Sequence, residues 1–292
     1  MDEERCGCKG ARYCLLCCQS SRVLQLKRLD GDSLDVYDQY KKFVYCMHCC
    51  KAFEHQLYDL TDREQLFRLA NDHSSHCHHS TVGLELEGLL LLPDFITEEE
   101  ERALVGEIDA TPWLLSQSGR RKQDYGPRVN FKRKRVKYDA FTGMPEYADL
   151  VLDRMRQLSP DSLDKYQPFE LCNLEYTSSR GSCIEFHTDD TWIWGNRLIS
   201  LNLVDGSVMS FVKDGHECIV LVPMPQRSLL CMADQIRYQW KHAVLRAHIG
   251  DRRIALTMRE PSPLFQSGGA LYDKYGKDLI EIGNRRISTE HN

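Results

Sequence analysis

No apolar run in this sequence is long enough to cross a membrane. The most apolar stretch, Leu89 to Leu92, is followed at once by Pro93 and Asp94, whereas a transmembrane helix needs roughly 20 apolar residues. The first residues, Met1 to Cys6, are polar and acidic, and no apolar segment typical of a signal peptide follows them. We therefore expect a soluble protein of the cytoplasm and nucleus without a membrane partner.

An excess of charge of one sign is also missing. The chain has 38 Lys and Arg against 43 Asp and Glu, a formal net charge of −5. This balance excludes a protein that binds nucleic acid through its bulk charge, although charge can still gather locally. There is no internal repeat that would indicate a solenoid. The 292 residues, 42% of them apolar, suffice for one large domain with a small appendage.

Cysteine, in contrast, is abundant and unevenly placed. Nine of the 13 cysteines lie before residue 78. In a reducing compartment they are thiols or metal ligands rather than disulfides. We expect a Cys/His-rich N-terminal region over residues 1–85 that ends in a linker near 71–80, a main domain over 86–265, and a C-terminal tail over 266–292.

The pattern of the main domain is mainly β. Thr97 and Glu100 form a capping box that predicts a helix over 98–110, and helical spacing predicts a second one over 145–158. Leu89 to Leu92 form an apolar run that predicts a buried strand. Further short strands are expected at 182–187, 198–204, 207–213, 217–222, 227–232 and 252–259. This pattern is typical of an antiparallel sandwich or barrel with helices packed on one side.

One constellation indicates metal chemistry. His187 and Asp189 are two residues apart, so a strand presents both side chains on one face, and His242 lies far downstream. Two histidines and one carboxylate leave open positions on a metal, as in non-haem Fe(II) oxygenases. The alternatives are a polar surface strand for His187 and Asp189 and a half-buried structural role for His242.

Two arginines extend this constellation. In Arg253-Ile-Ala-Leu-Thr-Met-Arg259, even spacing puts both arginines on one face of a strand. Buried arginines need anions, and a guanidinium grips a carboxylate through two hydrogen bonds. The alternative is a pair of arginines on a solvated strand face.

Together these residues resemble the AlkB family of Fe(II)- and 2-oxoglutarate-dependent dioxygenases. The matching pattern is His187-x-Asp189, then His242, then Arg253-x5-Arg259. The segment from Asn173 to Tyr176, followed by Gly181, resembles the Asn-x-Tyr-x-x-Gly strand of that family, with one extra residue between Asn and Tyr and two more before Gly.

The resemblance implies a fold and a reaction. The fold is a double-stranded β-helix, or jelly roll, with flanking helices, of the mainly β, α+β class. His187, Asp189 and His242 would hold Fe(II). Arg253, with Tyr176, Asn173 and Arg259, would form the 2-oxoglutarate site, with Arg259 as an orienting group near Asp189 or the substrate. The reaction would be an oxidative N-demethylation that releases formaldehyde and succinate.

Longer strings resemble one branch of the family. They are Cys6 to Cys17, Trp113 to Gly126, Cys172 to Tyr176, Trp192 to Gly195, and Gln239 to Ala243. That branch is associated with demethylation of a monomethylated lysine of actin and of N6-methyladenine in DNA, so the implied partners are a methylated protein, methylated DNA, or both. Other hypotheses are a catalytically silent zinc-binding adaptor for actin or chromatin partners and a protein hydroxylase.

The N-terminal cysteines predict a second metal site. Cys6, Cys8, Cys14 and Cys17 offer four thiols within twelve residues, which is the donor set of a structural Zn(II). The alternatives are free thiols, or a different set of ligands that borrows from Cys18, Cys46, Cys49 or His48.

Residues 120–137 form the strongest local cluster of charge. They hold nine basic residues and one acidic residue. Such a stretch indicates either an electrostatic binding surface for nucleic acid or an acidic protein partner, or a solvated loop. Trp192 and Trp194 follow the expected iron ligands, where they either stack on a base or, as we favour, belong to the core.

Overall fold

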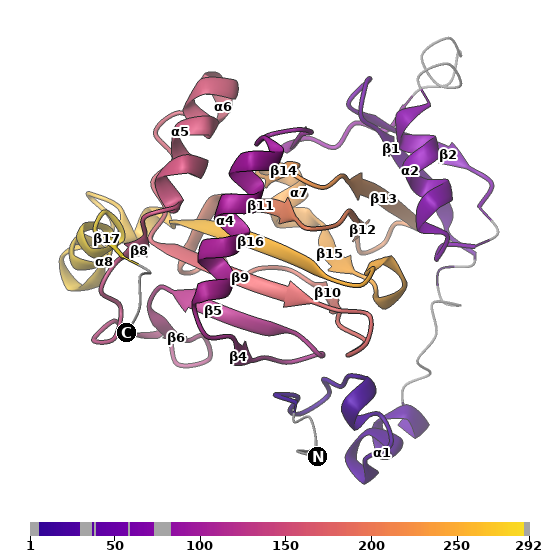
Figure 1. Cartoon of the computed structure of the whole chain (residues 1–292), viewed down its shortest axis with the longest axis horizontal. Coiled ribbons are helices and arrows are strands. Elements are labelled where there is room, and N and C mark those ends of the chain that lie inside the picture. Colours follow the sequence, from indigo (N-terminus) through magenta and orange to yellow (C-terminus); the bar gives the residue numbers. More distant parts are fainter. Residues whose placement is uncertain (1–5, 30–36, 38, 58, 73–82, 289–292) are drawn as a thin grey trace.

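Two β-sheets packed face to face form the centre of the protein (Figure 1). The computed structural model describes residues 6–29, 37, 39–57, 59–72 and 83–288. Most of the predicted linker, residues 73–80, therefore lies outside the described residues. In the part of the chain that is described, no helix is both long and apolar enough to span a bilayer.

The first sheet has seven strands, and every neighbouring pair in it is antiparallel. Their order is β3 (Leu89–Leu92), β14 (Leu229–Met232), β11 (Trp194–Leu203), β16 (Arg253–Pro261), β9 (Glu170–Tyr176), β5 (Arg121–Tyr125) and β4 (Leu114–Leu115). β16 lies in the middle of this sheet, between β11 and β9, and most of its residues are buried.

The second sheet has six strands, in the order β10 (Ile184–His187), β15 (Lys241–Val244), β12 (Ser207–Val212), β13 (Cys218–Met224), β1 (Lys41–Cys46) and β2 (Lys51–His55). β10 is an edge strand whose one partner in the sheet is β15. At the far side, β1 pairs with β13 in parallel, so part of the N-terminal region extends the sheet.

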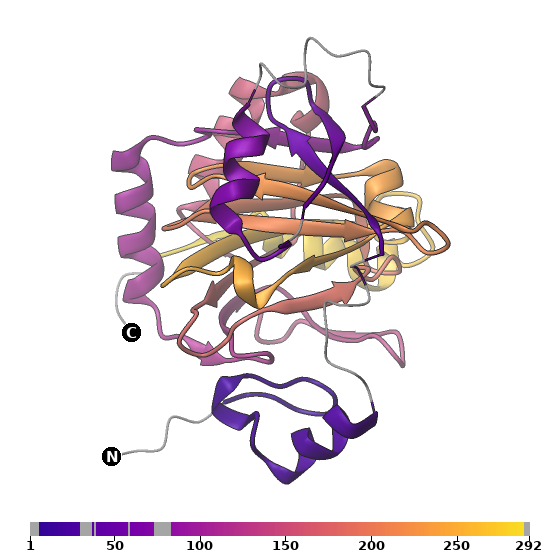
Figure 2. The same cartoon turned by 90° about the vertical axis from the view of Figure 1, so that its right-hand side faces the viewer.

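Apolar side chains fill three layers. The inter-sheet core, which includes Leu198, Phe211 and Val220, lies between the sheets. Helices α4 (Glu98–Ala110) and α5 (Ala148–Leu158) cover the outer face of the seven-stranded sheet. Helix α2 (Arg63–Asn71) covers the outer face of the other sheet (Figure 2). Helices therefore lie on both sides of the sandwich, rather than on one side as predicted.

Smaller elements complete the fold. They are α1 (Ser21–Leu29), the hairpin of β6 (Arg128–Asn130) and β7 (Arg135–Lys137), β8 (Met144–Pro145), α6 (Pro160–Leu163), α7 (Asp234–Gln239), α8 (Lys277–Gly283) and β17 (Arg286–Ile287). β17 pairs with β8, and Leu279 of α8 packs with Phe265. The described part of residues 266–292 is thus packed against the main fold.

The predicted jelly-roll architecture is confirmed. The helix predicted over 98–110 occurs with those bounds, and Thr97 and Glu100 form the expected capping box. The second predicted helix begins at Ala148 instead of 145. All six strands predicted between 182 and 259 occur, with shifted ends.

Candidate active site

Three predicted ligands meet at one end of the space between the sheets. His187 ends β10 and lies opposite His242 of β15 in the sheet register, with the two ring centroids 4.3 Å apart. Asp189 follows β10, and its Oδ2 lies 3.7 Å from Nε2 of His242. One ligand atom from each of the three residues lies within 4.8 Å of the others. The arrangement is thus compact enough to hold a single ion.

The protonation states of this triad also suit a divalent cation. Burial lowers the pKa of His242 to about 3, with a further contribution from His187. Burial likewise lowers the pKa of His187. Burial acts to raise the pKa of Asp189, but Arg259 and the two histidines outweigh it and lower the value to about 2. Two neutral imidazoles and one carboxylate are the forms that bind a metal.

Neighbouring backbone and side chains fix the orientation of the triad. Nδ1 of His187 donates to the carbonyl of Glu185 at 2.8 Å, which leaves the lone pair of Nε2 for a metal. The buried Arg237 of α7 donates to the carbonyls of Asp189 at 2.9 Å and Asp190 at 2.8 Å. Sequence reasoning missed Arg237, since a single arginine in a short helix carries no recognisable motif.

Arg253 faces an inner pocket beside the triad. This pocket is a cavity of about 60 Å³ whose lining includes all three triad residues, Tyr176 and Arg253. The side chain of Arg253 is only 1% exposed, and burial lowers its pKa. Among the residues that the structure describes, no carboxylate lies within ion-pair distance of it. A buried cation of this kind fits the free carboxylate of a bound diacid.

Asn202 orients Arg253 and was not found from the sequence. Its Oδ1 accepts a hydrogen bond from Nε of Arg253. Its amide group donates to the carbonyls of Asp205 at 2.8 Å and Pro225 at 2.9 Å, so the side chain is locked. An asparagine within the apolar Leu-Ile-Ser-Leu-Asn-Leu run of β11 is the one signal that could have indicated it.

Arg259 lies at the triad rather than at the free end of the pocket. It contacts Glu170 at 2.7 Å and Asp189 at 3.5 Å, and its guanidinium lies 4.3 Å from the ring centroid of Trp194. Because two carboxylates already balance its charge, the geometry favours a role in orienting Asp189 over one in binding a co-substrate.

The structure does not bring Asn173 into the pocket. Its amide nitrogen donates to Oε1 of Gln123 at 2.8 Å and to the hydroxyl of Tyr147 at 2.7 Å, on the face of β9 that is covered by helices. Leu174 and Tyr176 occupy the pocket face. Side chains three positions apart point to opposite faces of a regular strand, so we withdraw Asn173 from the predicted co-substrate site.

A larger outer cleft opens onto the same triad. It measures about 570 Å³ and shares His187, Asp189 and Arg259 with the inner pocket. The basic stretch supplies much of its wall, through Arg120, Lys122, Arg128, Phe131 and Lys137. Trp194 also lines this cleft, whereas Trp192 packs against Phe265 at 5.2 Å, in the core.

Comparison with known proteins identifies the family. No family model matches the chain. A Caenorhabditis elegans protein named DNA N6-methyl adenine demethylase is 49% identical over 286 residues, covering 98% of this chain and 96% of the relative. Human alpha-ketoglutarate-dependent dioxygenase alkB homolog 4 is 36% identical over 311 residues, covering 95% and 92%. This chain belongs to the AlkB family.

AlkB membership makes the protein a 2-oxoglutarate-dependent dioxygenase that uses Fe(II). The branch that the longer sequence strings resemble is AlkB homolog 4, and the similarity to its human and mouse members confirms that interpretation. A solved 2OG-Fe(II) oxygenase family oxidoreductase from Burkholderia pseudomallei aligns at a TM-score of 0.42 and 10% identity, covering 59% of this chain and 83% of that one.

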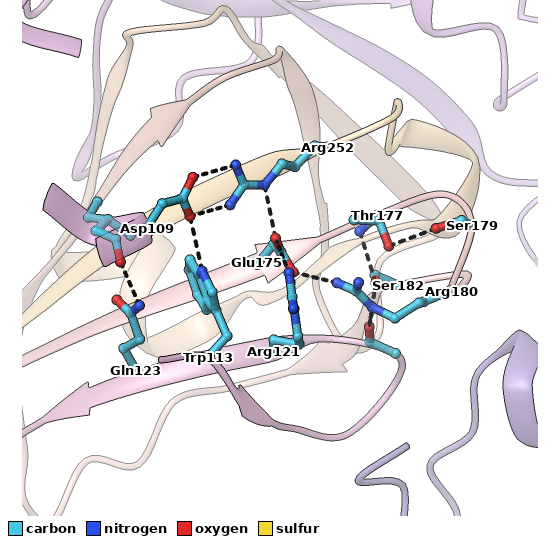
Figure 3. Close-up of polar contacts among 12 residues, drawn as sticks. Asp109, Trp113, Arg121, Gln123, Glu175, Thr177, Ser179, Arg180, Ser182 and Arg252 are labelled. Carbon is cyan, nitrogen blue, oxygen red and sulfur yellow. Dashed lines mark hydrogen bonds and ion pairs between the residues drawn. The ribbon is translucent and has the colours of Figure 1, made fainter. Parts of the chain in front are cut away.

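Behind the pocket wall of this AlkB protein lies a buried ionic cluster (Figure 3). Glu175 of β9 is 1% exposed and accepts from Arg121 at 2.5 Å, Arg180 at 2.6 Å and Arg252 at 2.9 Å. Arg252 also pairs with Asp109 at the end of α4. The cluster therefore ties β5, the turn after β9, and the start of β16 to one carboxylate.

Six cysteines in the N-terminal region of the AlkB protein form two separate clusters. Sγ atoms of Cys6, Cys8, Cys14 and Cys17 lie within 4.8 Å of one another. Cys46 and Cys49 form a separate pair in the β1–β2 turn, with their sulfurs 3.3 Å apart. The four predicted zinc ligands are thus assembled without a contribution from the second group.

In this AlkB protein, Arg253→Lys is expected to weaken 2-oxoglutarate binding by about 10- to 100-fold, because a hydrogen bond to a charged group contributes about 1.5–3 kcal/mol. The ammonium group of lysine cannot donate the two parallel hydrogen bonds that a guanidinium gives to a carboxylate. Anaerobic titration with 2-oxoglutarate would measure this. Fe(II) affinity without the co-substrate serves as the control and is expected to stay unchanged. Equal co-substrate affinity in both proteins would exclude Arg253 as the anchor.

Proposed function

We propose that this dioxygenase removes N-methyl groups oxidatively and that its substrate is N6-methyladenine in DNA. In this proposal His187, Asp189 and His242 hold Fe(II), and Arg253 and Tyr176 hold the far carboxylate of 2-oxoglutarate. With O2 as the oxidant, Fe(II) and 2-oxoglutarate bound there would supply the oxidising chemistry, in which 2-oxoglutarate gives succinate and CO2 and the hydroxylated methyl group leaves as formaldehyde. The protein contributes geometry and charge.

The observation that best supports this reaction is that the metal triad lies where two cavities meet. The inner pocket is small and ends at the buried Arg253, as a co-substrate site requires. The outer cleft is about 570 Å³, which leaves room for a nucleobase taken out of its stack. The chain could therefore hold the co-substrate in one cavity and the substrate in the other, both beside His187 and Asp189.

Two observations favour DNA as the substrate. The wall of the outer cleft carries Arg120, Arg128 and Lys137, and basic side chains neutralise phosphates along a nucleic-acid strand. The relative at 49% identity is named a DNA N6-methyl adenine demethylase. Because the proposed substrate is DNA, we propose that the protein is located in the nucleus as well as in the cytoplasm.

The substrate is tested by formaldehyde release from two probes in parallel, a single-stranded oligonucleotide with N6-methyladenine and an actin peptide with monomethyl-lysine. We expect formaldehyde from the oligonucleotide. Release from the peptide alone would replace DNA by methyl-lysine as the substrate. A hydroxylated product without formaldehyde would indicate a hydroxylase, and no turnover of 2-oxoglutarate under any condition would favour the adaptor hypothesis.

Phe131 offers the most exposed aromatic ring at the outer cleft. It is 43% exposed, lies on the β6–β7 turn and contacts Trp194 with ring centroids 5.2 Å apart. Stacking of a base on such a ring contributes about 1–3 kcal/mol. Phe131→Ala is therefore expected to weaken oligonucleotide binding by about 5- to 100-fold. The exposed Leu158 of α5, replaced by alanine, is the matched control, and unchanged affinity in Phe131→Ala would remove the ring from the substrate site.

A further inference from the structure

The cysteine segment, residues 6–18, has the geometry of a closed metal site. Its four cysteine sulfurs lie within 4.8 Å of one another, and those of Cys14 and Cys17 are 3.9 Å apart. Tetrahedral zinc with bonds of about 2.3 Å separates its sulfurs by about 3.8 Å. Thiolate sulfur is the donor that selects zinc over magnesium or calcium. A closed set of four leaves no position for a substrate, so the metal would be structural.

The segment has little else to hold it together. Within residues 6–18 the structure shows only Cys14 as buried, and its one regular element is a single 3-10 turn, Leu15–Cys17. A piece of chain this short buries too little apolar surface to be stable alone, and a metal is the common substitute for a core. With free thiols, the conformation of the segment would depend on the hydrogen bonds from Arg22 to the carbonyls of Gly10 and Arg12 and on its contacts with the main fold.

The cysteine segment lies against the outer rim of the active site. In Figures 1 and 2 it is beneath the end of the sandwich that carries β4 and β10. The backbone of Leu15 donates to Arg180 at 3.1 Å, in the turn that joins β9 to β10. Arg246 bridges the two parts, since it donates to the carbonyls of Gly181 and Tyr13 and lies 4.5 Å from the ring centroid of Tyr13.

Glycines permit the close approach. A Cβ on Gly7 would lie 2.7 Å from the carbonyl oxygen of Ser116, and one on Gly181 would lie 2.6 Å from Cγ of Leu15. Gly181 also has a positive φ of 58°, which other residues adopt only with strain. Gly7 therefore contacts the β4–β5 turn through its backbone, and Gly181 leaves room for the side chain of Leu15 against the turn that joins β9 to β10.

A short path leads from the segment to an iron ligand. Arg12, between the two pairs of cysteines, forms an ion pair with Glu185 at 2.5 Å. The carbonyl of Glu185 accepts the hydrogen bond from Nδ1 of His187. β10 is an edge strand with β15 as its one partner in the sheet, so the other side of β10 depends on contacts from outside the sheet.

We infer that Cys6, Cys8, Cys14 and Cys17 bind one Zn²⁺, and that the zinc-bound segment positions His187 by bracing β10 and the turn before it. The inference rests on the proposed iron site for the role of His187. The cysteine segment is then a positioning element: it touches neither co-substrate nor substrate, and it acts through Glu185.

The metal is tested by measuring the zinc content of the full-length protein. We expect about one zinc per chain in the wild type and in Cys18→Ser, which alters the neighbouring cysteine outside the set. We expect its loss in Cys8→Ser. A wild type purified without zinc, and unable to take it up, would overturn the metal site. Equal zinc loss in Cys18→Ser would overturn the proposed ligand set.

The coupling is tested with zinc still bound, in Arg12→Ala. Because the Arg12–Glu185 pair is partly exposed, we expect Fe(II) affinity to fall by only about two- to fivefold. Hydrogen exchange of residues 180–187 should rise in the same variant. Lys9→Ala removes the same charge from the same segment and should change neither quantity. Cys8→Ser should weaken Fe(II) binding further than Arg12→Ala.

The outcomes separate this inference from the proposed function. If Cys8→Ser loses zinc while Fe(II) affinity and the exchange of residues 180–187 stay at wild-type values, the positioning role is overturned. If the wild type binds zinc but never binds Fe(II), the proposed iron site fails, and the exchange measurement still decides whether the segment braces β10.

Discussion

Replacing His187 and Asp189 together by alanine is expected to abolish the conversion of 2-oxoglutarate to succinate. The double substitution removes two of the three side chains whose ligand atoms lie within 4.8 Å of one another. Loss of a group that merely orients a metal ligand costs about 10- to 100-fold in metal affinity, and loss of two ligands should cost more. Anaerobic Fe(II) titration followed by O2-dependent succinate formation measures both effects.

A suitable control for this experiment is His216→Ala. His216 is exposed in the β12–β13 loop, so this variant also removes an imidazole but should keep wild-type turnover. Succinate formation by the double variant at more than about a hundredth of the wild-type rate would contradict the assignment of the triad. A folded double variant that still binds the methylated oligonucleotide would show that the outer cleft is independent of the metal.

Replacing Glu175 by glutamine is expected to lower the free energy of unfolding by about 2 to 3 kcal/mol. Removing one partner of a buried ion pair typically costs about 3–5 kcal/mol. We expect somewhat less, because the side chains of Arg121 and Arg252 are 36% and 30% exposed and water can compensate them. Urea denaturation of the wild type and of Glu175→Gln at neutral pH, both with all native cysteines, measures the loss in the free energy of unfolding.

The effect of Glu175 should depend on pH in a defined direction. Burial acts to raise the pKa of this carboxyl, but hydrogen bonds from Arg121 and Arg180 outweigh it and hold the pKa below its usual value. The contribution to stability is therefore complete above the ordinary pKa of about 4.3 and is lost as the pH falls through the lower folded value. The stability gap between wild type and Glu175→Gln should shrink in acid.

Asp109→Asn is the matched comparison for this cluster. Asp109 pairs with Arg252 at 2.6 Å, and both side chains are about a third exposed, so the loss should stay below about 1 kcal/mol. Equal losses in the free energy of unfolding from Asp109→Asn and Glu175→Gln would mean that burial of the Glu175 carboxylate does not increase its contribution to stability.

Much of the metal triad could be predicted from the sequence because it depends on local periodicity. Two residues separated by one position share a face of a strand, and this rule relates His187 to Asp189 without knowledge of the fold. The same rule placed Arg253 and Arg259 on one face of β16. The capping box at Thr97 is equally local, and the helix that it predicted occurs with the predicted bounds.

What the sequence did not reveal depends on contacts between distant segments. Asn202 contacts Arg253, 51 positions away, and Arg237 contacts the carbonyl of Asp189, 48 positions away. Neither belongs to a pattern that periodicity can detect. Asn173 was assigned through the family motif, although its three-residue separation from Tyr176 directs the two side chains to opposite faces of β9. The pairing of β1 with β13 likewise joins parts of the chain that no local pattern relates.

The two halves of the proposed centre belong to different sheets. His187 and His242 come from the six-stranded sheet, whereas Arg253 and Tyr176 come from the seven-stranded one. The distance between the metal site and Arg253 is therefore set by the spacing of the two sheets, which depends on the apolar side chains packed between them. A buried apolar residue of this core such as Phe211 then acts as a spacer, and we expect a smaller side chain there to change the length of diacid that can reach both ends.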